Sequence, residues 1–371
     1  MLRGVLLNWI KRALFTILAV WSYGCLVVLL SLIATIPILQ FATLGYMIEC
    51  SSRVSRNLPW RECIPGTVVA RRIVIALGCI ALSWLPVWYI ADVAYTTELI
   101  EPGGDRAMQL RFAARVIALG WIAWISWAIF RGGKLRHFAW PAPIFFLKRF
   151  WRLSTWRDAE DRLWNFVVSL RLPMLLWLGF FAAFGAIVWL LVPGTMMIIA
   201  VSGQPNPGKG LLGVVGVMLM VWVLSLLPFL QTHFGNQRSI RSLFDVKAVR
   251  HGMQRAPWSA AWGIFVLFLF ATPLYLLRIE RIPEELEWTL TLFFVFFMFP
   301  AKLVVGWAWR RSQSLTTRAF WLWRYVAWMP QIAVILTYIG VLYLAKFTSW
   351  EGATVFYLQH AFLPPVPFFV R

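Results

Sequence analysis

The chain alternates between long apolar runs and shorter polar segments. A run of about 20 apolar residues is long enough to cross the hydrocarbon core of a bilayer as an α-helix. Eight runs meet this requirement: Leu14–Ile38, Val68–Ala91, Phe112–Phe130, Phe166–Val192, Leu211–Leu230, Ala260–Leu277, Trp288–Trp309 and Val326–Ala345. The pattern therefore predicts an all-α, polytopic integral membrane protein with about eight transmembrane helices.

Composition excludes the alternative of a water-soluble globule. Apolar residues make up 61% of the 371 residues and charged residues only 13%, whereas soluble domains carry about 25% charged residues. The four cysteines form no CxxC pair, so the ligand spacing typical of a zinc site is absent.

The first apolar run permits two interpretations. Residues 1–13 place apolar and basic side chains on opposite helical faces, which predicts a helix lying in the membrane interface. The run then continues past Pro37 to about Ile48. It is either one kinked span or a hairpin that dips into the bilayer and returns, and the eight-span prediction takes it as one span.

Basic residues are concentrated in alternate polar segments. The net charge is +20, and the bases gather in four segments, 53–72, 131–171, 238–255 and 310–324, while the segments 92–105 and 280–287 are acidic. The positive-inside rule places the four basic segments in the cytoplasm. With eight spans, both termini then face outward, although Arg3, Lys11 and Arg12 argue against this orientation of the first span.

The chain shows signs of an internal duplication. Corresponding positions are Pro37 with Pro228, Gln40 with Gln231, Pro86 with Pro273, and Pro173 with Pro330. An even number of spans in each copy predicts parallel repeats related by an axis along the membrane normal. The predicted organisation is an interfacial helix (1–13), a first four-helix half (14–192), a Pro/Gly linker (193–210), a second four-helix half (211–345) and an apolar tail on the outer face (346–371).

Several sequence blocks resemble an uncharacterised family of bacterial multi-pass membrane proteins, related to a domain of unknown function. The blocks are IPILQFATLGYMIECSSRVSR, RGGKLRHFAWP, VVSLRLP, PLYLLRIERIP and QHAFLPPVPF. The resemblance implies location in the bacterial inner (cytoplasmic) membrane and no catalytic activity.

Ionisable and polar groups inside the predicted spans are the candidate functional residues, because burying them in a bilayer is costly. Lys302 follows Pro300 and lies eight residues before Arg310, about 12 Å deep at 1.5 Å per residue. Arg171 lies just inside the fourth span. Gln231 and His233 end the fifth span, as Gln40 and Glu49 end the first run. Lys302, Arg171, Gln231 and His233 are the predicted intramembrane polar site, with interfacial snorkelling or capping as the alternative.

A second candidate surface lies in the basic segment before the fourth span, where bases alternate with Phe and Trp. Such a stretch would suit either single-stranded nucleic acid or an anionic leaflet. The flanking spans favour the lipid bilayer, so Lys148, Arg149, Arg152 and Arg157 are predicted to contact anionic phospholipid headgroups and no nucleic acid is expected.

No cofactor, metal or catalytic site is predicted. Gly208, Gly210 and Gly213 match G-x-G-x-x-G, but a dinucleotide site requires a preceding strand, and here a Pro/Gly segment enters an apolar run. The leading functional hypothesis is a non-enzymatic, transporter-like protein with a polar site between two repeated halves. The alternatives are a scaffold that docks partners or anionic lipid through basic cytoplasmic loops, and a membrane-embedded lipid-modifying enzyme.

Overall fold

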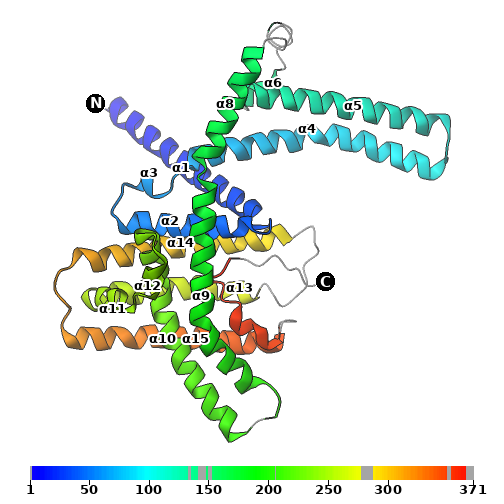
Figure 1. Ribbon diagram of the computed structural model, residues 1–371. Helices are drawn as coiled ribbons and strands as arrows, with labels where there is room; N and C mark the ends of the chain where they lie inside the picture. The colour runs from blue at the N-terminus through cyan, green and yellow to red at the C-terminus, as the bar shows by residue number, and fades with distance from the viewer. Residues whose placement is uncertain are drawn as a thin grey trace. The chain divides into compact units, whose positions relative to one another are not determined.

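The computed structural model is 87% helical, and the residues that it describes contain no strand (Figure 1). Those residues are 2–132, 135–140, 148, 153–204, 206–276, 287–348 and 352–364. Among the described residues, eight helical segments are long and apolar enough to cross a membrane: Lys11–Ala34, Thr67–Ile100, Asp105–Phe130, Trp164–Val201, Pro207–Gln237, Pro257–Tyr275, Trp288–Ser314 and Trp321–Thr348. Each overlaps one predicted run, so the predicted all-α class and the eight segments are confirmed.

The chain divides into two compact units, and their boundaries differ from those of the predicted halves. Unit 1 comprises residues 1–29 and 66–170, and unit 2 comprises residues 30–65 and 171–371. The fourth predicted span forms helix α9 (Leu172–Val201), which packs against α2 (Leu39–Ser55) and α10 (Pro207–Gln237). Unit 2 therefore takes in helices from both predicted halves.

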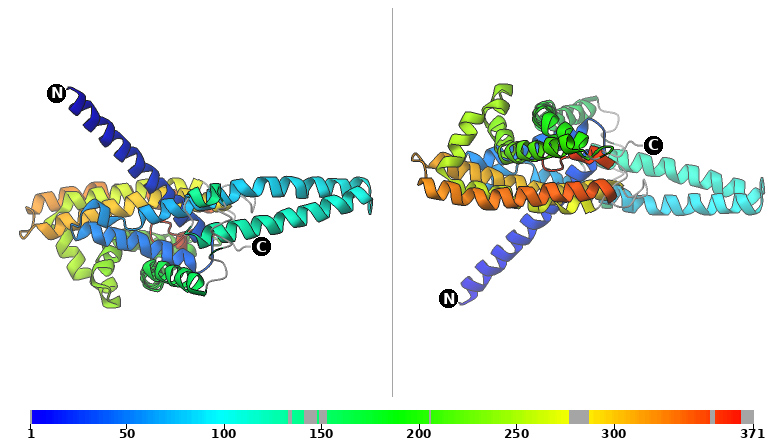
Figure 2. Two further views of the ribbon diagram at one scale, coloured as in Figure 1. Left: turned by 90° about the horizontal axis from the view of Figure 1, so that it is seen from above. Right: turned by 90° about the horizontal axis from the view of Figure 1, so that it is seen from below.

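Unit 1 contains a long antiparallel pair of helices, α4 (Thr67–Ile100) and α5 (Asp105–Phe130), visible from three sides in Figures 1 and 2. The indole of Trp121 lies edge-on to Trp84 at 4.7 Å between ring centroids and donates a hydrogen bond to Ser83. Most other side chains of the pair are exposed, as expected of helices that face lipid. The other helices that the structure describes in this unit are α6 (Leu135–Ala139), α8 (Leu153–Ser169) and the first part of α1.

The first apolar run is interrupted rather than simply kinked. Helix α1 spans Leu2–Ala34 without a break, so residues 2–13 are continuous with the first span and are not a separate helix. The chain leaves helical geometry around Pro37, because proline lacks an N–H and disfavours helix at the preceding residue. Ile38 has a φ of 72°, and α2 begins at the next residue, Leu39.

Helix α2 is the central element of unit 2, and 13 of its 17 residues are buried. It contacts α9, α10 and α14 (Glu287–Ser314). At the crossings with α9 and with α14, glycines leave almost no side chain between the two backbones. A Cβ on Gly306 of α14 would lie 2.3 Å from the carbonyl oxygen of Ser51, so only glycine permits that crossing. The other helices are α3 (Trp60–Cys63), η1 (Ile240–Phe244), α11 (Val246–Arg255), α12 (Pro257–Ala271), α13 (Pro273–Leu276), α15 (Trp321–Thr348) and η3 (Gly352–Tyr357).

The segment predicted as a Pro/Gly linker, 193–210, is mostly helical. Pro193 lies inside α9, which continues to Val201, and α10 begins at Pro207. Proline is well suited to this first helical position, because its missing N–H would have no partner there. Asn206 caps the helix by accepting a hydrogen bond from the Lys209 amide at 2.8 Å. Of the described residues in this segment, only 202–204 and 206 lie outside the two helices.

The described part of the C-terminal tail, residues 352–364, is buried within unit 2 and does not lie on a surface as predicted. Val355, Phe356 and Phe362 are at most 1% exposed, and η3 packs against α9 and α15. Gly194 leaves room for the ring of Tyr357, since a Cβ there would lie 2.8 Å from the ring. The segment is too short to span a membrane, yet its apolar side chains complete the core of the bundle. Residues 365–371 lie outside the described residues.

Candidate intramembrane polar site

A lysine and a glutamine meet in the interior of unit 2. Lys302 of α14 is 2% exposed and Gln231 of α10 is 1% exposed. The Lys302 Nζ donates a 2.6 Å hydrogen bond to Gln231 Oε1. The same ammonium lies 5.4 Å from the centroid of the Phe362 ring, within the range of a cation–π contact. Two residues predicted from sequence as intramembrane polar groups thus lie together.

The amide of Gln231 is held in one orientation by the backbone around it. Its Nε2 donates to the carbonyl oxygens of Ala182 (3.3 Å) and Phe362 (3.1 Å). Only the NH₂ end of an amide can donate, so the two carbonyls require the oxygen to point toward Lys302. The site therefore joins α9, α10, α14 and the C-terminal segment through one side chain.

Lys302 has no carboxylate partner among the described residues. The ion pairs of unit 2 involve Glu49 and Asp245, and neither includes Lys302. An amide dipole and an aromatic face compensate an ammonium only in part, and an unpaired buried charge is costly. The site is therefore suited to attracting an anion. The described residues contain no group of three or more potential His, Cys, Asp or Glu metal ligands.

A second polar cluster links α13 and α15 to the C-terminal segment. The hydroxyls of Tyr275 and Tyr338 are 2.7 Å apart. Tyr338 donates to Gln359 Oε1 at 2.8 Å, and Tyr275 donates to the Leu358 carbonyl at 2.8 Å. Tyr275 also accepts a hydrogen bond from the His360 amide. This cluster was not predicted from the sequence, although the two polar residues Gln359 and His360 within an apolar tail could have indicated a buried polar contact there.

The two other predicted site residues lie apart from this pair. His233 contacts Asp245, with 3.9 Å between Nε2 and Oδ2, and its ring lies edge-on to Trp309. Arg171 is exposed and has a φ of 50° at the residue before α9. This left-handed residue lies in the turn between Ser169, where α8 ends, and Leu172, where α9 begins.

The predicted lipid-contacting bases are only partly within the described residues. Lys148 and Arg157 are described and both are exposed, whereas Arg149 and Arg152 lie outside the described residues. Arg157 belongs to α8.

A buried carboxylate organises the basic end of unit 2. Glu49 of α2 is 2% exposed and lies 2.8 Å from Arg53, 3.5 Å from Arg56 and 3.3 Å from Arg238. Arg238 immediately follows α10, so the cluster joins the ends of α2 and α10. The sequence marked Glu49 as an interfacial cap, and the structure adds its three arginine partners.

Comparisons of the chain with protein-family models, curated proteins and solved structures find no match.

Proposed function

We propose that this multi-pass membrane protein is transporter-like and that unit 2 binds a small anionic substrate at Lys302. The observation that carries the proposal is a buried lysine whose Nζ donates to a neutral amide and has no carboxylate partner among the described residues. Intramembrane ionisable residues are costly and commonly mark ion or substrate pathways. An anion would supply the missing counter-charge, and the Phe362 ring beside the ammonium suits a substrate that also carries an apolar group.

The surroundings of the site support a binding role between two sets of helices. Gln231 and Lys302 belong to the second predicted half, whereas the Ala182 carbonyl that holds the amide belongs to the first. Sites between repeated halves are typical of secondary transporters. The C-terminal segment covers the site through Phe362, so substrate access requires that segment to move.

The proposed location is the bacterial inner membrane, with the basic segments on the cytoplasmic side. The excess of Lys and Arg in alternate polar segments supports this orientation. In this arrangement the Glu49–arginine cluster lies at the cytoplasmic end of unit 2.

The test is an anion flux assay on the purified full chain in proteoliposomes. Uptake of radiolabelled inorganic phosphate, benzoate and decanoate would be compared with uptake by protein-free liposomes. We expect benzoate, decanoate or both to enter faster when the protein is present. Lys302→Met should lower that rate by about tenfold or more, because a loss of about 1.4 kcal/mol of binding free energy weakens binding tenfold.

Lys346→Met is the matched control. Lys346 of α15 also lies against an aromatic ring, 5.0 Å from the Phe347 centroid, and donates to the carbonyl of Val201, but it takes no part in the Gln231 pair. Equal flux by wild type and a folded Lys302→Met variant would overturn the proposal, as would no flux of any of the three anions.

A further inference from the structure

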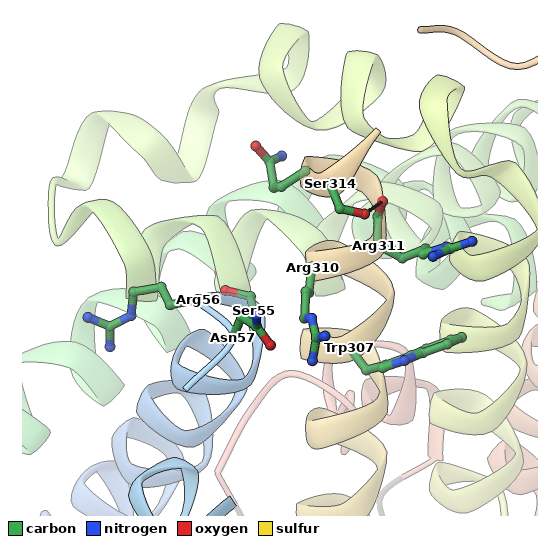
Figure 3. Close-up of a pocket in the computed structure, with 8 residues that line it drawn as sticks. Ser55, Arg56, Asn57, Trp307, Arg310, Arg311 and Ser314 are labelled. Carbon is green, nitrogen blue, oxygen red and sulfur yellow. Dashed lines mark hydrogen bonds between the residues drawn. The ribbon is translucent and has the colours of Figure 1, made fainter. Parts of the chain in front are cut away.

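The ends of α2 and α14 enclose a pocket lined by three arginines. The pocket has a volume of about 470 Å³, and its lining includes Arg56, Arg310, Arg311, Asn57 and Trp307. Figure 3 shows the Arg310 side chain between Asn57 and Trp307, whereas the side chains of Arg56 and Arg311 point away from it on opposite sides. The described residues that line this arginine pocket include no Asp or Glu.

The positive charge of the arginine pocket is largely uncompensated. Among the described residues, no carboxylate lies within ion-pair distance of Arg310 or Arg311. Arg56 reaches Glu49 at 3.5 Å, but that carboxylate has a closer contact with Arg53. Each helix C-terminus contributes roughly half a negative charge, so the ends of α2 and α14 offset about one arginine of the three. The pocket is therefore suited to a phosphate, which arginine recognises through paired hydrogen bonds.

A second pocket adjoins the first through Arg311. It has a volume of about 370 Å³ and is lined mainly by apolar side chains, among them Pro257, Trp258, Leu315 and Trp323, together with Arg311. Trp258 and Trp323 lie edge to face with centroids 6.2 Å apart and are each about half exposed. Tryptophans so exposed are typical of the membrane interface, so this tryptophan pocket is suited to an acyl chain.

We propose that the arginine pocket and the tryptophan pocket together bind one anionic phospholipid, with its phosphate at Arg310 and Arg311 and an acyl chain against Trp258 and Trp323. Arg311 lines both pockets, so one ligand that is anionic at one end and apolar at the other would fit the two together. Basic pockets between membrane helices bind anionic lipid headgroups. This site involves neither Lys302 nor Gln231, so it does not depend on the proposed transport function.

Native mass spectrometry of the purified full chain in a non-ionic detergent tests the proposal. The probes are dioleoyl-phosphatidylglycerol, dioleoyl-phosphatidylcholine and inorganic phosphate. We expect one tightly held phosphatidylglycerol per chain and several-fold weaker retention of phosphatidylcholine. Arg310→Gln/Arg311→Gln should weaken phosphatidylglycerol binding by roughly tenfold or more, because each base near a headgroup contributes on the order of a fivefold effect and two bases are removed.

The matched control is Arg241→Gln/Lys247→Gln. It removes the same charge from exposed positions of another basic segment and touches neither pocket, so binding should stay unchanged. Trp258→Ala/Trp323→Ala should weaken lipid binding without removing the arginines.

Three outcomes would overturn the proposal. Equal loss in the control variant would indicate diffuse electrostatic attraction. Competition by inorganic phosphate at the concentration of the lipid would indicate a soluble phosphate ligand. Full lipid binding by the folded tryptophan variant would show that the acyl chain is not held at that pocket.

Discussion

Gly45 of α2 and Gly179 of α9 face each other with no side chain between them. A Cβ built on Gly45 would lie 2.9 Å from the backbone nitrogen of Gly179 and 2.0 Å from the carbonyl oxygen of Leu175. A Cβ on Gly179 would lie 1.7 Å from the carbonyl oxygen of Phe41. Small residues let membrane helices approach closely, and this pair fixes the central helix of unit 2 against α9.

Gly179→Ala is therefore expected to destabilise unit 2. The new methyl group would meet backbone atoms that cannot rotate away, and overpacking of this kind costs about 1–3 kcal/mol or more. Heating the detergent-solubilised protein and measuring the fraction that stays monodisperse would reveal the loss. Gly340→Ala is the control, because no atom lies within 4 Å of a Cβ at that position of α15. A Gly179→Ala variant as heat-resistant as the control would contradict this account of the crossing.

Gln231 and Lys302 are expected to be energetically coupled. Gln231→Leu leaves the ammonium without its acceptor, and removing one partner of a buried charged contact costs about 3–5 kcal/mol. Lys302→Met removes the charge itself and should cost less. The double variant should then be more stable than Gln231→Leu alone.

Denaturation of the three variants in SDS, followed by circular dichroism, measures this coupling. A difference of about 1 kcal/mol or more from additivity is expected for residues in direct contact. Additive losses would mean that the hydrogen bond seen at 2.6 Å contributes little to stability.

Glu49→Gln should destabilise the protein far more than Glu98→Gln. The carboxylate of Glu49 is 3% exposed and faces three arginines, of which Arg53 is partly buried and the other two are exposed. Its neutralisation removes charged hydrogen bonds from a buried acceptor, at a cost of about 1.5–3 kcal/mol. Glu98 pairs with Arg111 in unit 1, where the two side chains are 24% and 52% exposed. Exposed pairs of this kind contribute only about 0–1 kcal/mol. Similar unfolding midpoints for the two variants would contradict the organising role of Glu49.

The eight apolar segments could be predicted from sequence because a membrane helix is encoded by one continuous run of side chains. The depth of Lys302 was predictable for the same reason, since it follows from counting residues along one helix. Its partner was identified only as a polar residue at the end of another run. Neither the spacing nor the composition showed that Gln231 and Lys302 meet.

The burial of the C-terminal segment was not predictable from local pattern. Phe362 contacts Gln231, 131 residues earlier in the chain, and such a contact leaves no periodicity in the sequence. An apolar segment too short to span a membrane fits an interface as well as a core. The sequence left open whether the first apolar run is one kinked span or a hairpin. In the structure α1 ends at Ala34, and the buried helix α2 begins at Leu39.

The thiol of Cys63 is expected to react slowly at neutral pH. Cys63 ends the short helix α3 and donates to the carbonyl of Leu58. Burial raises the pKa of this thiol, and the nearby guanidinium groups of Arg53 and Arg310 lower it by less. The thiolate is the reactive form, so a raised pKa means that less thiolate is present at pH 7.5 and that reactivity keeps rising as the pH increases.

Iodoacetamide alkylation of a variant that keeps only Cys63, with Cys25, Cys50 and Cys79 replaced by alanine, measures this pKa. The same variant denatured in SDS is the control, because its thiol is exposed. In the folded protein the alkylation rate should level off at a higher pH than in SDS. Steric shielding of the thiol would lower the rate equally at every pH, so a shifted plateau indicates a raised pKa. A plateau at the same pH in both states would show that burial does not disfavour the Cys63 thiolate.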